Sequence, residues 1–248
     1  MLQWQHLDGA AIRTVNTLAT LAPLKLDRTR QSAPQVCDAL REMILSVQLA
    51  PGTVLQRTEL AEHFGISQTP IRDALLRLGE EHLVDIYPQH ATVVSRIDVK
   101  AALQVHFLRR AIEIELLKAL CDLPDDAHRH LLQRLQTHLD TQQAALDPLE
   151  FAAFSVSDLA FHKEMYDAAD VAPLWSLVRR QSGHVDRLRR LNLPAQGKAQ
   201  AVVRDHRAIV EALARRDPAG AEAALRTHLA GTLAFVRDIR ERFPDWVV

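Results

Sequence analysis

The sequence predicts a mainly α-helical chain in which an N-terminal winged helix-turn-helix is followed by an all-α antiparallel helical bundle. The 248 residues include only 8 glycines and 5% aromatic side chains, which disfavours a β-sandwich or barrel. Apolar residues recur at steps of three and four along most of the chain, as on one face of a helix. Beyond residue 98 prolines punctuate this pattern, and several stand where a new helix would begin.

We expect three segments: an N-terminal arm over residues 1–33, a winged helix-turn-helix over residues 34–97 and a helical bundle over residues 98–248. In the winged segment, Pro51-Gly52 and Gly65 mark helix ends. The predicted elements there are helices over Gln35–Leu49, Thr58–Phe64 and Ser67–His82, and strands over Leu83–Tyr87 and Thr92–Val94.

The bundle segment predicts six helices. The short connections between them favour antiparallel neighbours. Their approximate ranges are 98–121, 125–146, 149–169, 173–192, 199–216 and 218–242.

Charge and cysteine content exclude several classes of protein. The net charge of -1 gives the chain as a whole no attraction for phosphates or anionic lipid. Two cysteines, Cys37 and Cys121, are too few for a disulfide scaffold or a thiolate metal cage, and they predict buried thiols in a reducing compartment. No apolar run reaches the ~18 residues of a membrane helix, and the chain does not open with a signal-peptide pattern. We therefore expect a soluble, cytoplasmic protein with no membrane partner.

Residues 55–78 fit a helix, a tight turn and a second helix that could lie in the major groove of DNA. Ala61 and Ile66 would pack between the two helices, while polar side chains at the start of the second helix point outward. The alternative is an ordinary helical hairpin whose polar residues are solvated. For His90, which lies in the predicted wing, the alternative is a solvated turn. The candidate contacts to base edges or phosphates are Arg57, Ser67, Gln68, Thr69, Arg72 and, from the wing, His90.

This segment resembles the GntR family of bacterial transcription regulators. The resemblance implies that Arg72 contacts double-stranded operator DNA and that groups near Thr69 help to place the helix. Three residues depart from the family pattern: Gln68 and Thr58 replace arginines, and Ala91 replaces a wing-tip glycine. Gln68 can still pair with adenine, so we expect altered base preference rather than lost binding. The matching motifs are Pro51-Gly52-x-x-Leu55, Glu59-Leu60-Ala61, Gly65-Ile66-Ser67-x-Thr69-Pro70-Ile71-Arg72-Asp73-Ala74-Leu75 and Leu78.

Local charge bears on how DNA would be bound. Residues 1–98 contain nine Lys and Arg against eleven Asp and Glu, a net charge of -2, so a monomer would bind weakly. Two reading heads on one palindromic operator double the contacts for a single association. We therefore expect a homodimer.

Four residues of the bundle segment could ligate a metal ion. Asp158 and His162 are four residues apart, hence on one helix face, and His206 and His228 lie on apolar stripes. A single inward histidine is usually a core residue, but three with an aspartate supply ligands suited to zinc, nickel, manganese or iron. The pattern leaves both readings open. We expect most of the other bundle histidines to be exposed, namely His106, His128, His130, His138 and His184.

Residues from about 98 to 240 resemble the FCD-type effector domain of the FadR-like branch of the GntR family. The motifs are Arg109-x-x-x-Glu113, Asp158-x-x-x-His162, Asp205-His206-x-x-Ile209 and His228. The resemblance implies that Asp158, His162, His206 and His228 are the metal ligands. It also makes Arg109 a clamp for a small carboxylate effector, with Arg110 as the fallback; the alternative for Arg109 is an ion pair with Glu113.

The expected function is that of a dimeric, effector-responsive DNA-binding transcription regulator, and not an enzyme. Its cofactor would be a divalent transition metal, zinc first, with nickel, manganese or iron as alternatives. A metal-dependent hydrolase is one rival interpretation, although the sequence has no HExxH or similar motif. A bundle without metal that only dimerises is the other.

Overall fold

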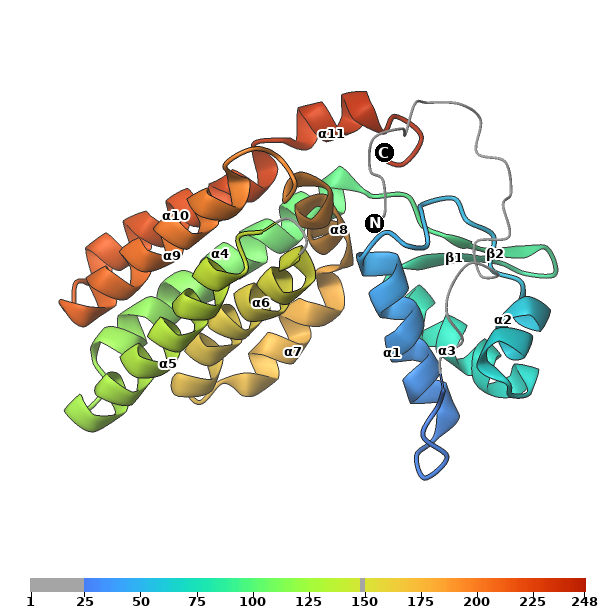
Figure 1. The fold of residues 1–248 in the computed structure, drawn as a ribbon, viewed down its shortest axis with the longest axis horizontal. Helices are drawn as coiled ribbons and strands as arrows, with labels where there is room; N and C mark the ends of the chain where they lie inside the picture. The colour runs from blue at the N-terminus through green and yellow to red at the C-terminus, as the bar shows by residue number, and fades with distance from the viewer. Residues whose placement is uncertain (1–24, 148–149) are drawn as a thin grey trace. The chain divides into compact units, whose positions relative to one another are not determined.

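The computed structural model describes residues 25–147 and 150–248. Contacts divide the chain into two compact units (Figure 1). The head comprises the described residues up to Ile97 together with Arg240–Val248, and the bundle is Asp98–Ile239. The predicted arm falls largely outside the described residues.

The head has the expected three helices and a β-hairpin, a winged helix-turn-helix. Gly65 ends the second helix in the left-handed conformation, with φ of 63°, which a residue without Cβ adopts at little cost. Ala61 and Ile66 pack against the head core, as the sequence predicts. The elements are α1 (Ser32–Leu45), α2 (Arg57–Phe64), α3 (Gln68–Glu80), β1 (Val84–Tyr87) and β2 (Ala91–Val94).

The hairpin is antiparallel, with Val84 opposite Val94 and Tyr87 opposite Ala91. A second pairing follows it, because Ile97 forms a parallel bridge with Val247. The Ile97 amide donates to the Trp246 carbonyl at 2.7 Å, and the Val248 amide donates to the Ile97 carbonyl at 3.0 Å. Residues 240–248, which the sequence analysis assigned to the bundle segment, thus belong with the head.

The rest of the chain is all α-helical, as expected, but each of two predicted helices is divided into two shorter helices. The range 173–192 breaks at Ser182, which is followed by Gly183, a poor helix former. The range 218–242 breaks after Leu233, close to Gly231. The helices are α4 (Val99–Cys121), α5 (Asp125–Ala144), α6 (Phe151–Ala168), α7 (Ala172–Gln181), α8 (Gly183–Asn192), α9 (Lys198–Ala214), α10 (Pro218–Leu233) and α11 (Val236–Arg242).

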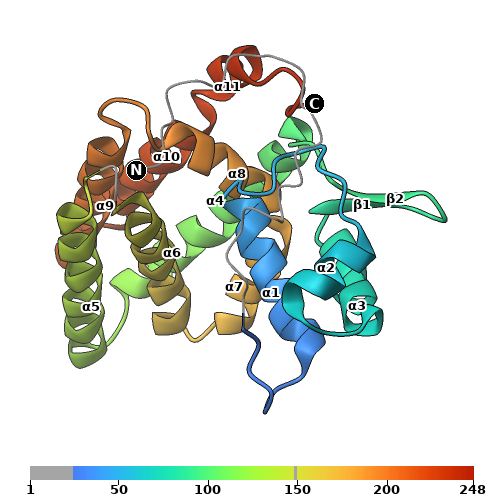
Figure 2. The ribbon, with the colours of Figure 1, turned by 45° about the vertical axis from the view of Figure 1, so that its right-hand side comes forward.

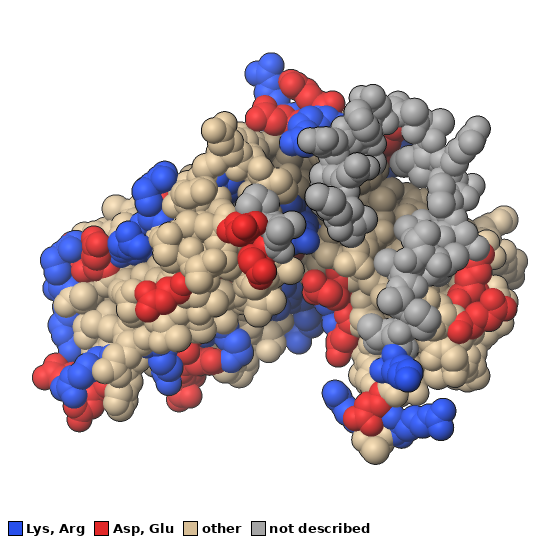
Figure 3. All heavy atoms as spheres, in the orientation of Figure 1, with Lys and Arg blue, Asp and Glu red and all other residues tan. Residues whose placement is uncertain are grey.

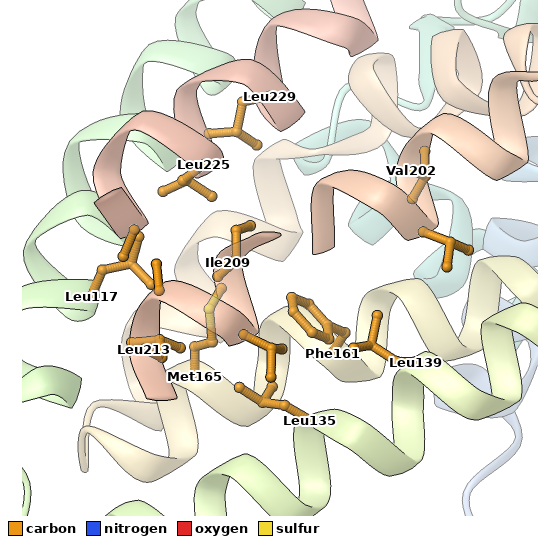
Figure 4. Close-up of a cluster of buried hydrophobic side chains, with 14 of the residues drawn as sticks. Leu117, Leu135, Leu139, Phe161, Met165, Val202, Ile209, Leu213, Leu225 and Leu229 are labelled. Atoms are coloured by element: carbon orange, nitrogen blue, oxygen red, sulfur yellow. The ribbon is translucent and has the colours of Figure 1, made fainter. Parts of the chain in front are cut away.

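Five helices of the bundle close into a ring. The helix α9 packs between α10 and α5, α5 packs on α6, and α4 closes the ring against α6 and α10 (Figures 1 and 2). All five contribute to one apolar core, where Figure 4 shows Phe161 beside Leu139 and Leu135 of α5. Side chains that point inward from the five helices therefore meet.

The outer surface of the bundle is mixed in charge. On the face visible in Figure 3, Lys and Arg side chains alternate with Asp and Glu. No helix among the described residues is long and apolar enough to span a membrane.

Candidate metal centre and DNA-reading face

Four potential metal ligands from three helices meet inside the ring. Asp158 and His162 lie one turn apart on α6, His206 lies on α9 and His228 on α10. All four side chains are buried, and one ligand atom of each lies within 4.8 Å of every other. The Nε2 atoms of His162 and His206 lie 3.1 and 3.3 Å from Nε2 of His228, and Asp158 Oδ1 lies 3.8 Å from His206 Nε2. We call these four residues the histidine cluster.

Polar groups on the far side of two imidazole rings orient them. Nδ1 of His206 donates to Gln142 Oε1 at 2.8 Å, because the Gln142 amide nitrogen donates to the Ser157 carbonyl at 3.3 Å. Glu113 Oε2 faces Nδ1 of His162 at 3.2 Å without a well-aligned hydrogen bond, and its negative charge favours a proton on that nitrogen. Both partners hold the proton on Nδ1, so the Nε2 lone pairs point into the cluster.

The centre of the cluster has more lone pairs than protons. Nδ1 of His228 faces Asp205 Oδ2 at 3.9 Å, and a proton on its Nε2 could bond only one of the two neighbouring rings. Asp158 Oδ1 is buried without a hydrogen-bond partner among the described residues. Burial first, and then neighbouring histidines, lower the pKa of His206 and His228 well below the ordinary value, so both rings are neutral at pH 7. Nitrogen and oxygen lone pairs that converge on one buried point fit a divalent transition metal ion.

Glu113 joins the cluster to Arg109. Arg109 Nε donates to Glu113 Oε1 at 2.9 Å, and the Tyr166 hydroxyl lies 3.4 Å from the same oxygen. Burial raises the pKa of Glu113, but Arg109 and His162 outweigh burial and lower it to about 2. The ion pair considered as the alternative role for Arg109 is therefore present. Arg110, the fallback clamp, is only half-buried.

Arg189 of α8 contacts the cluster from another side. Its guanidinium donates to Asp158 Oδ2, the oxygen that does not face His206. Burial, and then the nearby Arg109, lower the pKa of Arg189 to about 9, so the side chain stays charged at neutral pH. Two arginines thus flank the cluster.

The candidate DNA contacts gather on the outside of the head. Ser67 caps α3 without a side-chain hydrogen bond, Gln68 and Thr69 form its first turn, and Arg72 follows one turn later. No ion pair among the described residues engages Arg72 or the Arg57 side chain at the start of α2. All six candidates are exposed: Arg57, Ser67, Gln68, Thr69, Arg72 and His90.

Comparison with known proteins matches each unit to a family. Residues 32–94 match the gntR family of bacterial regulatory proteins, and residues 104–231 match the FCD domain. The chain belongs to the FadR-like branch of the GntR family. The FCD match includes the whole histidine cluster.

Relatives of this GntR family member are transcription regulators. It is 34% identical over 206 residues to an uncharacterised HTH-type transcriptional regulator in an unstable DNA locus of Streptomyces ambofaciens, covering 83% of this chain and 85% of the relative. It is 28% identical to the HTH-type transcriptional repressor RspR of Escherichia coli K12, covering 90% of this chain and 96% of that one. The chain is therefore a DNA-binding transcription regulator, and the hydrolase interpretation is set aside.

Two solved structures share the fold. A putative GntR regulator from Rhodococcus superposes with a TM-score of 0.69 at 18% identity, covering 83% of this chain and 97% of that one. The E. coli protein McbR/YncC superposes with a TM-score of 0.67 at 19% identity, covering 84% and 98%. Both superpositions cover more than four fifths of this chain, so the fold of both units is shared.

Sequence reasoning missed three groups around the cluster, namely Gln142, Asp205 as a partner of His228, and Arg189. The sequence does indicate that Gln142 is unusual, because a polar residue there continues the buried apolar stripe of α5 formed by Leu131, Leu135 and Leu139. Nothing in the sequence singles out Arg189, since α8 contains several arginines that the pattern does not distinguish.

The expectation that most of the other five bundle histidines are exposed is wrong: His130 is exposed, His106 and His138 are half-buried, and His128 and His184 are buried. His128 is buried because its Nε2 bonds the Leu213 carbonyl at 2.9 Å. His184 is buried because its Nδ1 accepts the Asp98 amide at 3.0 Å.

Proposed function

We propose that this GntR regulator is a cytoplasmic homodimer that binds a palindromic operator, and that its bundle holds one divalent transition metal ion and a small carboxylate effector that modulates DNA binding. The observation that carries the proposal is the convergence of three neutral imidazoles and an unpartnered Asp158 oxygen at one buried point. A buried set of lone pairs without protons between them costs free energy, and a bound cation removes that cost.

Asp158, His162, His206 and His228 would hold the ion, with Glu113 and Gln142 orienting two of the imidazoles. Zinc is the first candidate because it accepts nitrogen and oxygen ligands and can take a further ligand beyond these four; nickel, manganese and iron accept the same donors. The ion would supply a Lewis-acidic positive charge to which a carboxylate can coordinate.

Arg109 would bind the carboxylate of the effector. Its Nε already donates to Glu113, and its two Nη groups make no hydrogen bond among the described residues. A guanidinium held by one bond keeps its planar fork for a carboxylate ligand. The ion pair with Glu113 therefore positions Arg109 rather than competing with the clamp.

On DNA, the first turn of α3 would enter the major groove with Gln68, Thr69 and Arg72 toward the bases. Arg57 and Ser67 would contact phosphates, and His90 would reach the minor groove from the wing. Pairing two heads on a symmetric site would offset the weak DNA affinity that follows from the net negative charge of one head.

Operator selection from random or genomic DNA tests the head. We expect a symmetric motif, with affinity that falls steeply as salt is added. Arg72→Ala should weaken specific binding by about 1–3 kcal/mol, whereas Arg77→Ala, in the last turn of α3, should bind like wild type. Enrichment of no symmetric motif, or equal binding by both variants, would count against this reading face.

Elemental analysis tests the bundle. Protein purified without chelator should contain about one equivalent of a transition metal per chain, and chelation should lower its melting temperature. His206→Ala should lose the metal, and His130→Ala, which alters an exposed histidine of α5, should retain it. If wild type holds no metal and takes up none when it is added, the cluster is a structural core.

A further inference from the structure

The helix α8 packs against the two helices that connect the bundle to the head. The chain leaves the head after Ile97 and returns to it at Arg240. The helix α4 begins directly after the first of these points, and α10 leads through α11 to the second. Because α8 contacts both α4 and α10, a displacement of α8 would act on both connections.

Two hydrogen-bond donors meet at His184 of α8. Its Nδ1 accepts the backbone amide of Asp98 at 3.0 Å, and Nη2 of Arg187 lies 3.1 Å from the same nitrogen. Because a backbone amide and a guanidinium only donate, Nδ1 carries a lone pair and the ring proton lies on Nε2. Both side chains are buried. The first residue of the bundle is therefore held to α8 by a buried imidazole.

The junction between head and bundle, Ile97-Asp98, has all four of its backbone polar groups in hydrogen bonds. On the head side, the Ile97 amide donates to the Trp246 carbonyl, and the Ile97 carbonyl accepts the Val248 amide. On the bundle side, the Asp98 carbonyl accepts the first hydrogen bond of α4, and the Asp98 amide donates to His184. Three of these bonds join backbone groups and the fourth depends on the His184 side chain. A change in the direction of the chain here must break or move one of them.

Five residues further along α8, Arg189 contacts the histidine cluster. Its guanidinium donates to Asp158 Oδ2, while Oδ1 of the same carboxylate lies 3.8 Å from His206 Nε2. A carboxylate that coordinates a cation shares its negative charge with that cation, so its attraction for a second cation weakens. A metal ion at Asp158 would therefore change the contact that holds α8 at Arg189.

The helix α8 is separated from its neighbours along the chain. It has 10 residues, the break at Ser182 divides it from α7, and Pro194 follows its last residue, Asn192, by two positions. His184 and Arg189 are about 7.5 Å apart along the helix axis. A short helix whose backbone hydrogen bonds are internal moves as one piece, so a change at Arg189 is carried to His184.

We propose that His184 is a positioning residue that couples metal occupancy of the histidine cluster to the junction at Asp98, with α8 as the connecting element. Metal at Asp158 loosens Arg189, α8 shifts, and the hydrogen bond from Asp98 to His184 changes with it. By linkage, zinc then alters operator affinity by the factor by which the operator alters zinc affinity. This inference rests on the proposed function, in which the cluster holds the ion and the head binds an operator.

The coupling is measured on the full-length protein as the ratio of operator affinities without metal and with saturating zinc. The operator is the symmetric site obtained by selection. In wild type the two affinities should differ at least about fivefold. His184→Leu removes the acceptor for the Asp98 amide and should bring them to within about twofold. His184→Asn, whose Oδ1 can take the place of Nδ1, should restore the difference, and the exposed His130→Leu should retain it.

Hydrogen exchange at the Asp98 amide gives a readout that does not involve DNA. Zinc should change its protection in wild type, whereas in His184→Leu it should exchange faster and at the same rate with and without zinc. Zinc affinity of His184→Leu, from chelator competition, should stay within about threefold of wild type, since His184 is not a proposed ligand. A purely structural role for His184 would lower the melting temperature and leave the zinc dependence of operator binding intact.

Arg189→Gln provides a second variant in case His184→Leu does not fold. It releases α8 from Asp158 at the other end, so the two operator affinities should again lie within about twofold at saturating zinc. The inference is overturned if wild type binds zinc without any change in operator affinity, or if either variant keeps the wild-type difference. A wild-type protein that binds no zinc, or no operator, would instead defeat the proposed function.

Discussion

The head and the bundle bury different kinds of side chain. Among the described residues of the head, Ser95 is the one buried polar side chain, and its other buried residues are apolar. The bundle interior instead includes a large charged and polar set: Arg109, Glu113, His128, Gln142, Ser157, Asp158, His162, Ser182, His184, Arg187, Asn192, His206 and His228.

This difference follows from where each unit meets its ligand. DNA is bound from outside, so the proposed reading residues Gln68, Thr69 and Arg72 can be exposed to water while the core of the head only stabilises the fold. The ion and acid of the proposed function would be bound where water is excluded, and the bundle buries charges whose desolvation lowers its stability. Conditions that change charge should therefore act on the bundle and spare the head.

Acidification should give the largest contrast. In metal-free protein the pKa values of His162, His206 and His228 lie below the ordinary 6.5, since burial favours the neutral rings. As the pH falls through 6.5 the unfolded chain takes up protons that the folded bundle does not, so stability drops. The loss approaches roughly 1.4 kcal/mol per pH unit for each histidine.

Hydrogen exchange at pH 7.5 and 5.5, corrected for intrinsic rates, measures this effect in each unit. Protection should fall in α6, α9 and α10 and persist in α1 and α3, where no buried histidine is described. His228→Gln should reduce the pH dependence, while the exposed His130→Gln should leave it unchanged. Equal losses in the two units would contradict the contrast.

Phe161→Ala should give the next largest loss of bundle stability. The ring is fully buried and stacks on His206, with centroids 4.0 Å apart and planes at 9°. Its truncation removes core contacts and the support of one ligand, so denaturant unfolding of the bundle should lose about 3–5 kcal/mol. Val156→Ala, on the same helix but 68% exposed, should change stability by less than about 0.5 kcal/mol. Similar losses for both variants would argue against this core.

Gln142→Leu tests whether the hydrogen bond between Gln142 and His206 contributes to metal affinity. The change removes the acceptor that fixes the Nδ1 proton of His206 while keeping the volume nearly constant. Zinc affinity in a chelator competition should fall about 10–100-fold. Gln143→Leu, at the exposed neighbouring position, is the control and should match wild type. An unchanged affinity in Gln142→Leu would mean that the imidazole is oriented by packing alone.

The smallest effect is expected in the head, from its ion pair between α1 and α3. Arg41 makes two bonds of 2.6 Å to Glu81, with side chains 29% and 16% exposed. Because water still reaches both groups, Arg41→Gln should cost about 1 kcal/mol or less in thermal unfolding. The exposed Arg96→Gln serves as its reference. A loss as large as that of Phe161→Ala would remove the contrast between the units.

The sequence predicted most of what depends on spacing along one helix. The left-handed Gly65, the first turn of α3 and the Asp158–His162 pair are all fixed by residues within a few positions of one another. The inward direction of His206 and His228 was readable from the apolar stripes around them. Their meeting point was not, because it depends on how α6, α9 and α10 pack.

Partners that come from other helices escaped prediction for the same reason. In the sequence Arg189 cannot be told from a surface arginine, because its position depends on the packing of α8 against α4. Asp205 directly precedes His206, but the sequence does not indicate that its side chain faces His228. The division of the range 173–192 was also missed. The Ser182-Gly183 pair weakens the helix there because glycine is a poor helix former, and apolar periodicity continues across the break without indicating it.

The bridge between Ile97 and Val247 affects how the chain is made as well as how it folds. Protein synthesis delivers Ile97 well before Val247, with all of the bundle sequence in between. On the ribosome the helices of the head can assemble early, but the backbone groups of Ile97 lack their partners until the bundle has been translated. Completion of the head is thereby tied to synthesis of the bundle.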